Sequence, residues 1–263
     1  IGRYVAQRAG IGINAGRIRG LGSKIRGGEV QHTGVIPFLK KFEATVRSCT
    51  QNGVRGGSAT VHFPIWHQEI EDILVLKNNK GTEDNRVRKL DYSIQISQLF
   101  YQRFINNEDI TLFSPHNVPG LYEAFGTKEF DELYEKYERA YSIPQTKVSA
   151  RELFTDMLKE RAETGRIYIM NIDHCNTHSS FNDKVYMSNL CQEITLPTDP
   201  LTHIDGEGEI ALCILSAINV GTIKIEELSN LCDLAVRGLE ELIDFQEYPV
   251  EAAKRSTKAR RSL

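Results

Sequence analysis

Apolar positions along the chain change several times between the spacing of a helix and the spacing of a strand. Apolar residues three and four apart predict helices, and such stripes occupy 37–48, 66–74, 96–104, 130–137, 153–158 and 225–245. Short apolar runs between turn residues predict strands, and these runs occupy 59–63, 110–113 and 167–172. Helices that alternate with short apolar strands favour an α/β fold in which the strands pair in parallel.

Local signals place the ends of several of these elements. Pro37 suits the first turn of a helix, and Ser149 with Glu152 forms a capping box before the stripe at 153–158. Asparagine, glycine and other turn residues predict turns at 78–81 and 173–178. The pattern contains no internal repeat and no low-complexity segment.

Residues 1–28 lack a clear period and combine many glycines with arginines and a lysine. Glycine lets the backbone approach a ligand closely, and arginine offers a fork of donors to phosphate oxygens. The stretch therefore predicts phosphate-binding backbone, with two flexible loops as the plainer alternative. The glycine spacing at 10–16 does not fit the G-x-G-x-x-G motif of dinucleotide-binding folds, so that interpretation is discounted.

Composition places the chain among ordinary globular proteins. It has 263 residues, 25% of them charged, and a net charge of −3, which argues against a general nucleic-acid surface. We interpret the basic run at 254–261 as a solvated segment. No apolar run approaches the ~20 residues of a membrane span, so a cytoplasmic location is the default. The chain begins in mid-pattern at Ile1, and we expect an interior piece of a longer protein.

The five cysteines are too few for a disulfide framework, so reduced thiols are expected. Cys232 falls on the apolar stripe of 225–245 and is predicted to lie in the core. Cys191 lies between Asn189 and Glu193, and in an extended segment these three side chains would share one face. An amide, a thiol and a carboxylate on one face suggest a site, although the residues alone leave an inert buried thiol open.

A zinc site is a further possibility for the second half of the chain. His174, Cys175, His178 and Cys191 could supply four ligands, but a structural zinc site normally shows two close pairs of ligands and the second pair is missing here. We therefore predict no metal site. His174 and Cys175 are expected to be turn residues buried against the fold.

Nine short segments resemble segments of a single enzyme family and follow one another in the order found in that family. They are 7–17, 26–29, 49–57, 76–79, 112–116, 164–168, 174–178, 189–193 and 211–213. The resemblance that they carry extends over nearly the whole chain. With them the chain resembles the catalytic alpha subunit of class I, aerobic ribonucleotide reductases of bacteria and phages.

The resemblance implies a fold and a place within it. The implied fold is a ten-stranded α/β barrel of two five-stranded parallel halves, with the active-site cysteine on a finger loop inside. This chain would be a partial catalytic barrel domain over 1–263 that supplies the first half. Effector-specificity loops 1 and 2 would lie within 1–57 and the active-site cysteines within 188–213. The N-terminal region and the second half-barrel would be absent.

The resemblance also implies catalytic roles. Cys191 matches the residue that becomes a thiyl radical and abstracts the 3′ hydrogen of the ribose. Glu193 matches the carboxylate that takes the proton of the 3′ hydroxyl, and Asn189 matches the amide that holds the ribose hydroxyls. Ala9 and Gly10 match residues whose backbone contacts the substrate. The resemblance also places Leu190 and Arg55 among the substrate-binding residues.

Reduction of the substrate needs two electrons from a pair of thiols. Cys213 matches one member of this pair, on a barrel strand over 209–213 that faces the substrate. The residues alone favour a core cysteine in an apolar strand. The other cysteines of the chain do not match its partner, which we expect upstream of Ile1.

Two loops are implied to bind a deoxynucleoside triphosphate effector. Arg19 and Arg26 match the first loop, which contacts the effector phosphates. Gln51 and Arg55 match the second loop, which communicates between the effector and the substrate base. Asn52 stands where related bacterial enzymes have glycine, so the flexibility of the second loop could differ.

The implied activity is reduction of ribonucleoside diphosphates to 2′-deoxyribonucleoside diphosphates. No cofactor is expected in this chain, because a metal-radical beta subunit would supply the radical. The other implied partners are deoxynucleoside triphosphate or ATP effectors, thioredoxin or glutaredoxin, and a second alpha subunit. The alternatives are a cobalamin-dependent class II reductase and, for the chain as it stands, an inactive nucleotide-binding fragment.

Overall fold

The computed structural model describes residues 1–49, 53, 56–204 and 206–263. The chain divides into two compact units, Ile1–Thr195 and Leu196–Leu263. Within the described residues, no helix has the length and apolar character needed to cross a membrane.

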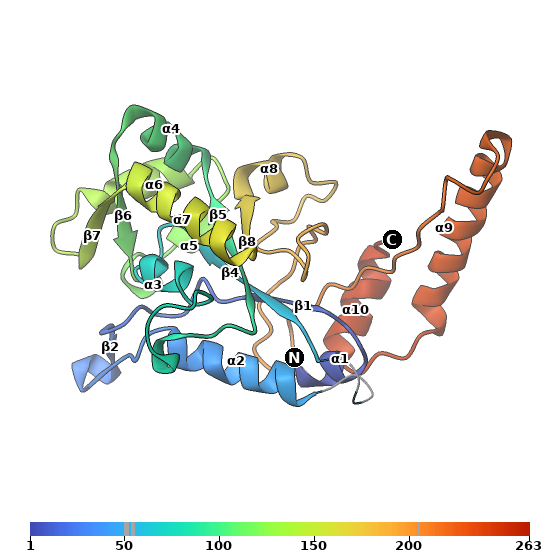
Figure 1. The fold of residues 1–263 in the computed structure, drawn as a ribbon, viewed down its shortest axis with the longest axis horizontal. Helices are drawn as coiled ribbons and strands as arrows, with labels where there is room; N and C mark the ends of the chain where they lie inside the picture. The colour runs from blue at the N-terminus through green and yellow to red at the C-terminus, as the bar shows by residue number, and fades with distance from the viewer. Residues whose placement is uncertain (50–52, 54–55, 205) are drawn as a thin grey trace. The chain divides into compact units, whose positions relative to one another are not determined.

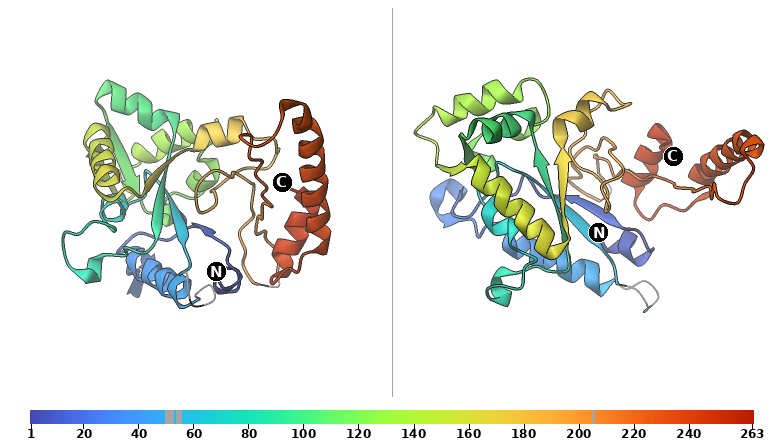
Figure 2. Two further views of the ribbon diagram at one scale, coloured as in Figure 1. Left: turned by 45° about the vertical axis from the view of Figure 1, so that its right-hand side comes forward. Right: turned by 45° about the horizontal axis from the view of Figure 1, so that its top comes forward.

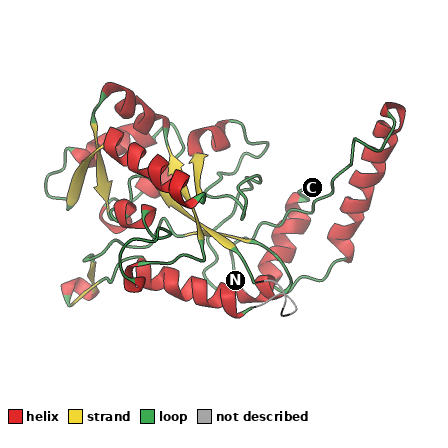
Figure 3. Cartoon of the chain, viewed as in Figure 1, coloured by secondary structure: helices red, strands yellow, loops and turns green. Residues whose placement is uncertain are grey.

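A sheet of four parallel strands forms the centre of the first unit (Figures 1 and 3). Its strands run in the order β1 (Ile11–Asn14), β4 (Ala59–Pro64), β5 (Asp91–Ile96) and β8 (Ile167–Asn171). The α/β class, the parallel pairing and the strands predicted at 59–63 and 167–172 are thereby confirmed. The sequence pattern missed β1 and β5.

Three predicted helices are confirmed, namely α2 (Ile36–Ser48), α6 (Phe130–Glu138) and α7 (Ala150–Thr164). Ser149 caps α7 as expected, since its hydroxyl accepts a hydrogen bond from the Glu152 N–H. The remaining elements of this unit are α1 (Gly2–Ala6), β2 (Lys24–Ile25), η1 (Arg26–Gly28), β3 (Val30–Gln31), α3 (Ile70–Leu74), η2 (Glu83–Asn85), α4 (Gln98–Asn106), β6 (Asp109–Phe113), η3 (Pro115–Asn117), α5 (Leu121–Ala124), β7 (Gln145–Ser149) and α8 (Ile172–Thr177).

Three predicted boundaries were wrong. The stripe at 66–74 is helical only in α3, and Trp66 precedes this helix and packs into a separate apolar cluster. Ile96 ends β5 instead of beginning a helix, and α4 starts after Ser97, an extended residue that precedes its first turn. Residues 173–178 fall largely in α8 and not in a turn, and His174 on this helix is exposed.

The two faces of the central sheet differ in chemistry. By strand register, Val61, Phe63, Tyr92 and Ile94 point toward one face, and they share a core with side chains of α2, α4 and α7. Figure 2 shows the ribbons of the sheet and of these helices from two further sides. Successive strand residues point to opposite faces, so on the other face β1, β4 and β5 carry a small or polar set that includes Gly12, Asn14, Thr60, His62, Ser93 and Gln95. The strand β8 adds Tyr168 and Met170 to this face. Four members of this set, Thr60, His62, Ser93 and Gln95, have no exposed surface.

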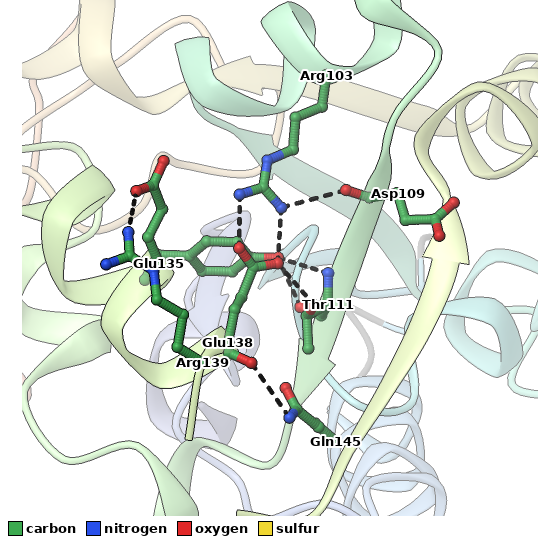
Figure 4. Close-up of polar contacts among 8 residues, drawn as sticks. Arg103, Asp109, Thr111, Glu135, Glu138, Arg139 and Gln145 are labelled. Atoms are coloured by element: carbon green, nitrogen blue, oxygen red, sulfur yellow. Dashed lines mark hydrogen bonds and ion pairs between the residues drawn. The ribbon is translucent and has the colours of Figure 1, made fainter. Parts of the chain in front are cut away.

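The strand predicted at 110–113 is confirmed as β6, but it lies outside the central sheet and pairs antiparallel with β7. Beside this hairpin, Arg103 on α4 donates two hydrogen bonds of 2.6 Å to the Glu138 carboxylate on α6 (Figure 4). Thr111 donates to the same carboxylate at 2.6 Å. A polar hollow of about 500 Å³ opens here, and the charges that line it include these paired groups.

The second unit holds η4 (Ile225–Glu227), α9 (Leu228–Phe245) and α10 (Glu251–Arg260). The helix predicted over 225–245 is confirmed, but Cys232 is exposed and not a core residue. The basic run at 254–261 is largely helical, and Lys254, Arg255 and Lys258 are exposed, as expected for a solvated segment. Its last two arginines pair with acids, Arg260 with Glu209 and Arg261 with Glu240.

The strand expected over 209–213 does not form. These residues have no regular secondary structure, and their backbone finds partners other than a neighbouring strand. The Ile210 carbonyl accepts a hydrogen bond of 2.6 Å from the Ser256 hydroxyl on α10. Cys213 is half-buried.

The Arg103–Glu138 pair gives a first prediction. Glu138→Ala leaves a guanidinium that is 11% exposed without its carboxylate, and we expect a loss of about 3–5 kcal/mol in the free energy of unfolding. Urea titration followed by the fluorescence of Trp66, the single tryptophan, measures it. Glu135→Ala is the matched control, because its pair with Arg139 is exposed and worth about 0.5 kcal/mol. Equal losses in the two variants would contradict this account.

A second prediction concerns the buried histidines of and after β4. Burial lowers the pKa of both His62 and His67 from 6.5 to about 4. The unfolded chain therefore takes up protons below pH 6.5 that the folded chain does not, and stability falls as the pH drops from 6.5 toward 4. Each histidine contributes a loss of about 2 kcal/mol between about pH 7 and about pH 5.

His62→Phe removes one of these two contributions. We expect the fall in unfolding free energy over that pH interval to shrink by about 2 kcal/mol, measured by the same urea titration at both pH values. His178→Phe is the control, because this side chain is exposed at the end of α8. An undiminished fall in His62→Phe would show that the His62 ring is not held neutral by burial.

Candidate active site

Residues 188–194 form a tight loop, which we call the finger loop, and it carries the predicted catalytic thiol. Leu190 and Cys191 lie in a turn, and Gln192 has a φ of 66°. This left-handed residue breaks the extended geometry, so the prediction that Asn189, Cys191 and Glu193 share one face of an extended segment was wrong. Cys191 and Glu193 are exposed at the turn.

Side chains at the base of the finger loop close it. The Ile194 N–H donates a 3.1 Å hydrogen bond to Asn189 Oδ1, and the Ser188 hydroxyl donates a 2.6 Å bond to the Ile194 carbonyl. A backbone bond of 3.4 Å from the Asn189 N–H to the Ile194 carbonyl completes the closure. Asn189 is therefore part of the loop's own framework, and its Oδ1 atom is committed to the backbone.

The finger loop lies directly on the ends of β1 and β4. A Cβ atom at Gly12 would overlap the Ser188 carbonyl oxygen, and a Cβ at Gly10 would overlap the Leu190 side chain. The Thr60 hydroxyl donates a 2.5 Å bond to the Leu190 carbonyl. The structure thus brings the predicted substrate-binding residues Gly10 and Leu190 together from opposite ends of the unit. Glycine is required at 12 because the loop backbone approaches so closely, and at 10 its lack of a side chain leaves room for Leu190.

The same loop also contacts β5 and β8. Gln192 Nε2 donates a 2.6 Å bond to the Ile169 carbonyl on β8, and its Oε1 accepts a bond from the Ser93 hydroxyl on β5. Just before the loop, Gln95 on β5 donates to the Tyr186 carbonyl. All four strands of the sheet therefore hold the segment that carries Cys191.

His62 lies under the base of the loop. Its ring is fully buried against the backbone of Ser188 and Asn189. Neither ring nitrogen has a well-formed hydrogen bond to the described residues. Desolvation dominates over these backbone contacts and lowers the pKa of His62 to about 4, so the ring is neutral at physiological pH.

Two stacked tyrosines flank the site. The rings of Tyr122 and Tyr186 are parallel within 9° with centroids 6.0 Å apart, and the Tyr122 hydroxyl donates a 2.7 Å bond to Asn14 Oδ1 on β1. Arg17 lies over both rings and Lys184 over Tyr186. Burial lowers the pKa of Lys184 to about 8. This side of the site therefore presents two cations held against aromatic faces.

The glycine-rich stretch, predicted to be phosphate-binding backbone with flexible loops as the alternative, is held by hydrogen bonds to buried side chains of Glu69 and Ser114. The Glu69 carboxylate accepts bonds from the N–H groups of Leu21 at 2.9 Å and Val35 at 3.1 Å. Burial raises the pKa of Glu69, an effect that these backbone donors partly offset. Ser114 accepts a 3.0 Å bond from the Gly20 N–H.

The predicted effector residues are only partly described. Arg19 is half-exposed and donates a 3.0 Å bond to the Lys24 carbonyl, whereas Arg26 is exposed with a φ of 50°. Gln51 and Arg55, predicted for the second effector loop, lie outside the described residues. Ala9 is half-buried beside Gly10, and its N–H bonds the Tyr4 carbonyl at 3.0 Å.

The remaining cysteines are dispersed through the chain. Cys213 belongs to the second unit and Cys191 to the first. Cys175, on α8, is half-buried, and burial raises the pKa of its thiol. Within the described residues, no group of three or more histidine, cysteine, aspartate or glutamate side chains could hold a metal ion.

The sequence pattern missed the residues that hold the finger loop, namely Thr60, His62, Ser93, Gln95 and Gln192. One signal for four of them exists in the strands. In β4 and β5 these polar residues alternate with large apolar ones, yet every residue of β4 is buried. Polar residues that alternate within a strand buried on both faces indicate that a polar segment of the chain covers one face.

Comparisons with known proteins identify the family. The family model of the ribonucleotide reductase barrel domain matches residues 1–263. The chain is 61% identical to the ribonucleoside-diphosphate reductase subunit alpha of Haemophilus influenzae, over 99% of this chain and 35% of that protein. It is 59% identical to the ribonucleoside-diphosphate reductase 1 subunit alpha of Escherichia coli over the same shares.

A phage protein is also similar. The subunit alpha of Enterobacteria phage T4 is 47% identical over 98% of this chain and 35% of the phage protein. The chain thus spans about a third of the length of these relatives. Their names do not favour the cobalamin-dependent alternative. The resemblance to the bacterial and phage enzymes is confirmed, and the chain belongs to the ribonucleotide reductase barrel-domain family.

Proposed function

We propose that this chain supplies the catalytic thiol of a class I ribonucleoside-diphosphate reductase alpha subunit. The observation that carries the proposal is the finger loop. It presents an exposed Cys191 next to Glu193 and is held by all four strands of a parallel sheet.

The proposed reaction begins at Cys191. As a thiyl radical it abstracts the 3′ hydrogen of the ribose, which forms an S–H bond and leaves a carbon radical. The Glu193 carboxylate takes the proton of the 3′ hydroxyl, and one thiol of the reducing pair gives its proton to the 2′ hydroxyl, which leaves as water. Asn189 holds the ribose hydroxyls; since its Oδ1 accepts a bond from the Ile194 N–H, its Nδ2 is the atom available to donate to them.

A pair of thiols then reduces the radical intermediate. The two thiols lose two electrons and become a disulfide, and Cys191 returns its hydrogen atom to C3′, which regenerates the thiyl radical. Cys213 is proposed as one of the two thiols. Its partner is expected outside this chain, so the 263-residue chain alone should not reduce diphosphates.

The proposed partners follow from this chemistry. A beta subunit with a metal-radical centre supplies the radical, and thioredoxin or glutaredoxin reduces the disulfide. We propose no cofactor in this chain, no nucleic-acid or membrane partner, and a cytoplasmic location. Two alpha subunits would associate as a homodimer.

Effector binding is proposed for the glycine-rich stretch near the N-terminus. Arg19 and Arg26 would contact the phosphates of a deoxynucleoside triphosphate or ATP, with Gln51 in the following loop. Arg55 would contact the substrate base and couple it to the effector. The exposure of Arg26 and the tethering of this stretch by Glu69 support a fixed loop that presents cationic groups.

A third prediction separates the two catalytic thiols. In a full-length alpha subunit that carries this chain, with its beta subunit, Cys191→Ser should release no tritium from 3′-tritiated CDP, because an O–H bond is too strong for the radical to form. Cys213→Ser should still release tritium and then lose free cytosine, because abstraction occurs but reduction fails.

The measurement scores tritium and free cytosine for each variant. Cys232→Ser is the matched control, since this exposed thiol on α9 has no proposed role, and it should behave as wild type. Tritium release from Cys191→Ser, or inertness of a folded Cys213→Ser, would overturn the assignment of roles.

A fourth prediction concerns the second effector loop. Arg55→Ala should reduce the effect of ATP and dTTP on the choice between CDP and GDP by about tenfold, because the coupling between the two sites is expected to pass through this residue. The ratio of CDP to GDP reduction is measured with each effector. Arg47→Ala, on the exposed surface of α2, serves as the control. Unchanged ratios in Arg55→Ala would argue against the loop assignment.

A further inference from the structure

The inference concerns Gln192, which lies between the two proposed reacting groups, and it rests on the proposed function. Its φ of 66° is in the left-handed region, where a residue with a side chain loses roughly 1 kcal/mol. Such a conformation persists when surrounding contacts hold it. The finger loop supplies these contacts through the Gln192 side chain.

Both ends of the Gln192 amide are paired with the sheet. Nε2 donates a 2.6 Å bond to the Ile169 carbonyl on β8, and Oε1 accepts from the Ser93 hydroxyl on β5. Ile94 and Ile169 are directly paired across these two strands. The amide therefore spans the join between β5 and β8, just below the turn that presents the thiol.

The Ser93 hydroxyl is committed to this arrangement. Ser93 has no exposed surface, so its hydroxyl would lack solvent if the glutamine were removed. A buried hydroxyl without a partner costs roughly 1–3 kcal/mol. Both side chains are therefore stabilised by the hydrogen bond between Ser93 and Gln192, and this bond holds the Gln192 side chain in one rotamer.

On the other side of Cys191, the Thr60 hydroxyl holds the Leu190 carbonyl at 2.5 Å. The thiol is therefore fixed between two anchors that come from neighbouring strands. The anchor at Gln192 also lies directly before Glu193. A shift of the Gln192 backbone would turn both the thiol and the carboxylate.

We propose that Gln192 and Ser93 form a clamp that positions Cys191 and Glu193 for attack on the ribose. Neither residue touches the reacting atoms in this assignment. The clamp acts by holding Gln192 in its left-handed conformation. The residues on either side of Gln192 are Cys191, the proposed radical thiol, and Glu193, the proposed base. Misplacement of reacting groups by about 1 Å can cost about a hundredfold in rate.

A double-mutant cycle in the full-length holoenzyme tests the clamp. Gln192→Leu keeps the side-chain size and removes both bonds, and Ser93→Ala removes the hydroxyl. We expect each variant to lower kcat for CDP by about tenfold or more, with KM changed less than about twofold. The double variant should be no worse than the poorer single variant, because the two residues act as one unit.

Gln192→Gly separates the side chain from the backbone. Glycine adopts the left-handed conformation without strain but provides neither bond. The clamp predicts a kcat at least as low as that of Gln192→Leu. A wild-type kcat in the glycine variant would show that the turn conformation alone is sufficient, and it would overturn the proposal.

Hydrogen exchange on the 263-residue chain gives a readout that needs no turnover. In Gln192→Leu the amides of residues 192–194, including the Ile194 N–H bonded to Asn189, should exchange at least about tenfold faster than in wild type. Gln102→Leu, the same change on the exposed side of α4, should leave this exchange unchanged. Unchanged exchange in Gln192→Leu would contradict the clamp.

These outcomes distinguish the clamp from the proposed function. If the wild-type holoenzyme does not reduce CDP, or Cys191→Ser still releases 3′ tritium, the proposed function fails while the exchange result still reports on the clamp. If the wild type is active and the folded Gln192→Leu and Ser93→Ala variants match its kcat, the clamp fails and the proposed function stands.

Discussion

The site depends on the fact that its parallel sheet is buried on both faces by different partners. One face meets apolar helices, and the other meets the backbone and polar side chains of the finger loop. Because strand residues alternate between faces, successive residues of β4 contact the apolar core and the finger loop in turn. Val61 and Phe63 belong to the apolar core, whereas Thr60 and His62 lie under the loop.

The polar face serves the loop in two physical ways. Gly10 and Gly12 on one side remove side chains so that the loop backbone can approach closely. Thr60 and Ser93 on the next two strands instead provide hydroxyls that reach the loop. Backbone groups of a buried loop need such partners, because an unpaired buried carbonyl or N–H is costly. The glycines of this face thus leave room for the loop, and the hydroxyls of this face form hydrogen bonds with it.

Periodicity predicted the elements with strong local signals. The capped helix α7 and the strand β4 carry these signals within themselves. It failed for β1, whose Gly12 weakens strand propensity, and for β5, whose last residue Ile96 also fits the helical stripe of α4. The prediction that Cys232 is buried was wrong because the apolar stripe of α9 is only partly covered: Ile243 is buried, Leu231 and Leu239 are half-buried, and Cys232 is exposed.

The site was predictable only in part. Family resemblance pointed to Cys191, Glu193 and Gly10, and the fold places Gly10 against the loop that carries the other two. Periodicity could not assign their roles, because radical chemistry leaves no mark in the spacing of residues. The alternation in β4 and β5 indicates only that a polar segment covers Ser93 and its neighbours. It does not indicate which segment, since Ser93 lies 99 residues from the glutamine that it bonds.

That separation has a consequence for how the chain acquires its reactive thiol. The bond between Thr60 and Leu190 spans 130 residues, and the contact between Gly10 and Leu190 requires β1 to be in place. Contacts between distant residues form late in folding, after shorter loops have closed. The thiol should therefore reach its oriented state only when the whole sheet is assembled. An incompletely folded chain would carry the same cysteine without the geometry that the proposed radical chemistry requires.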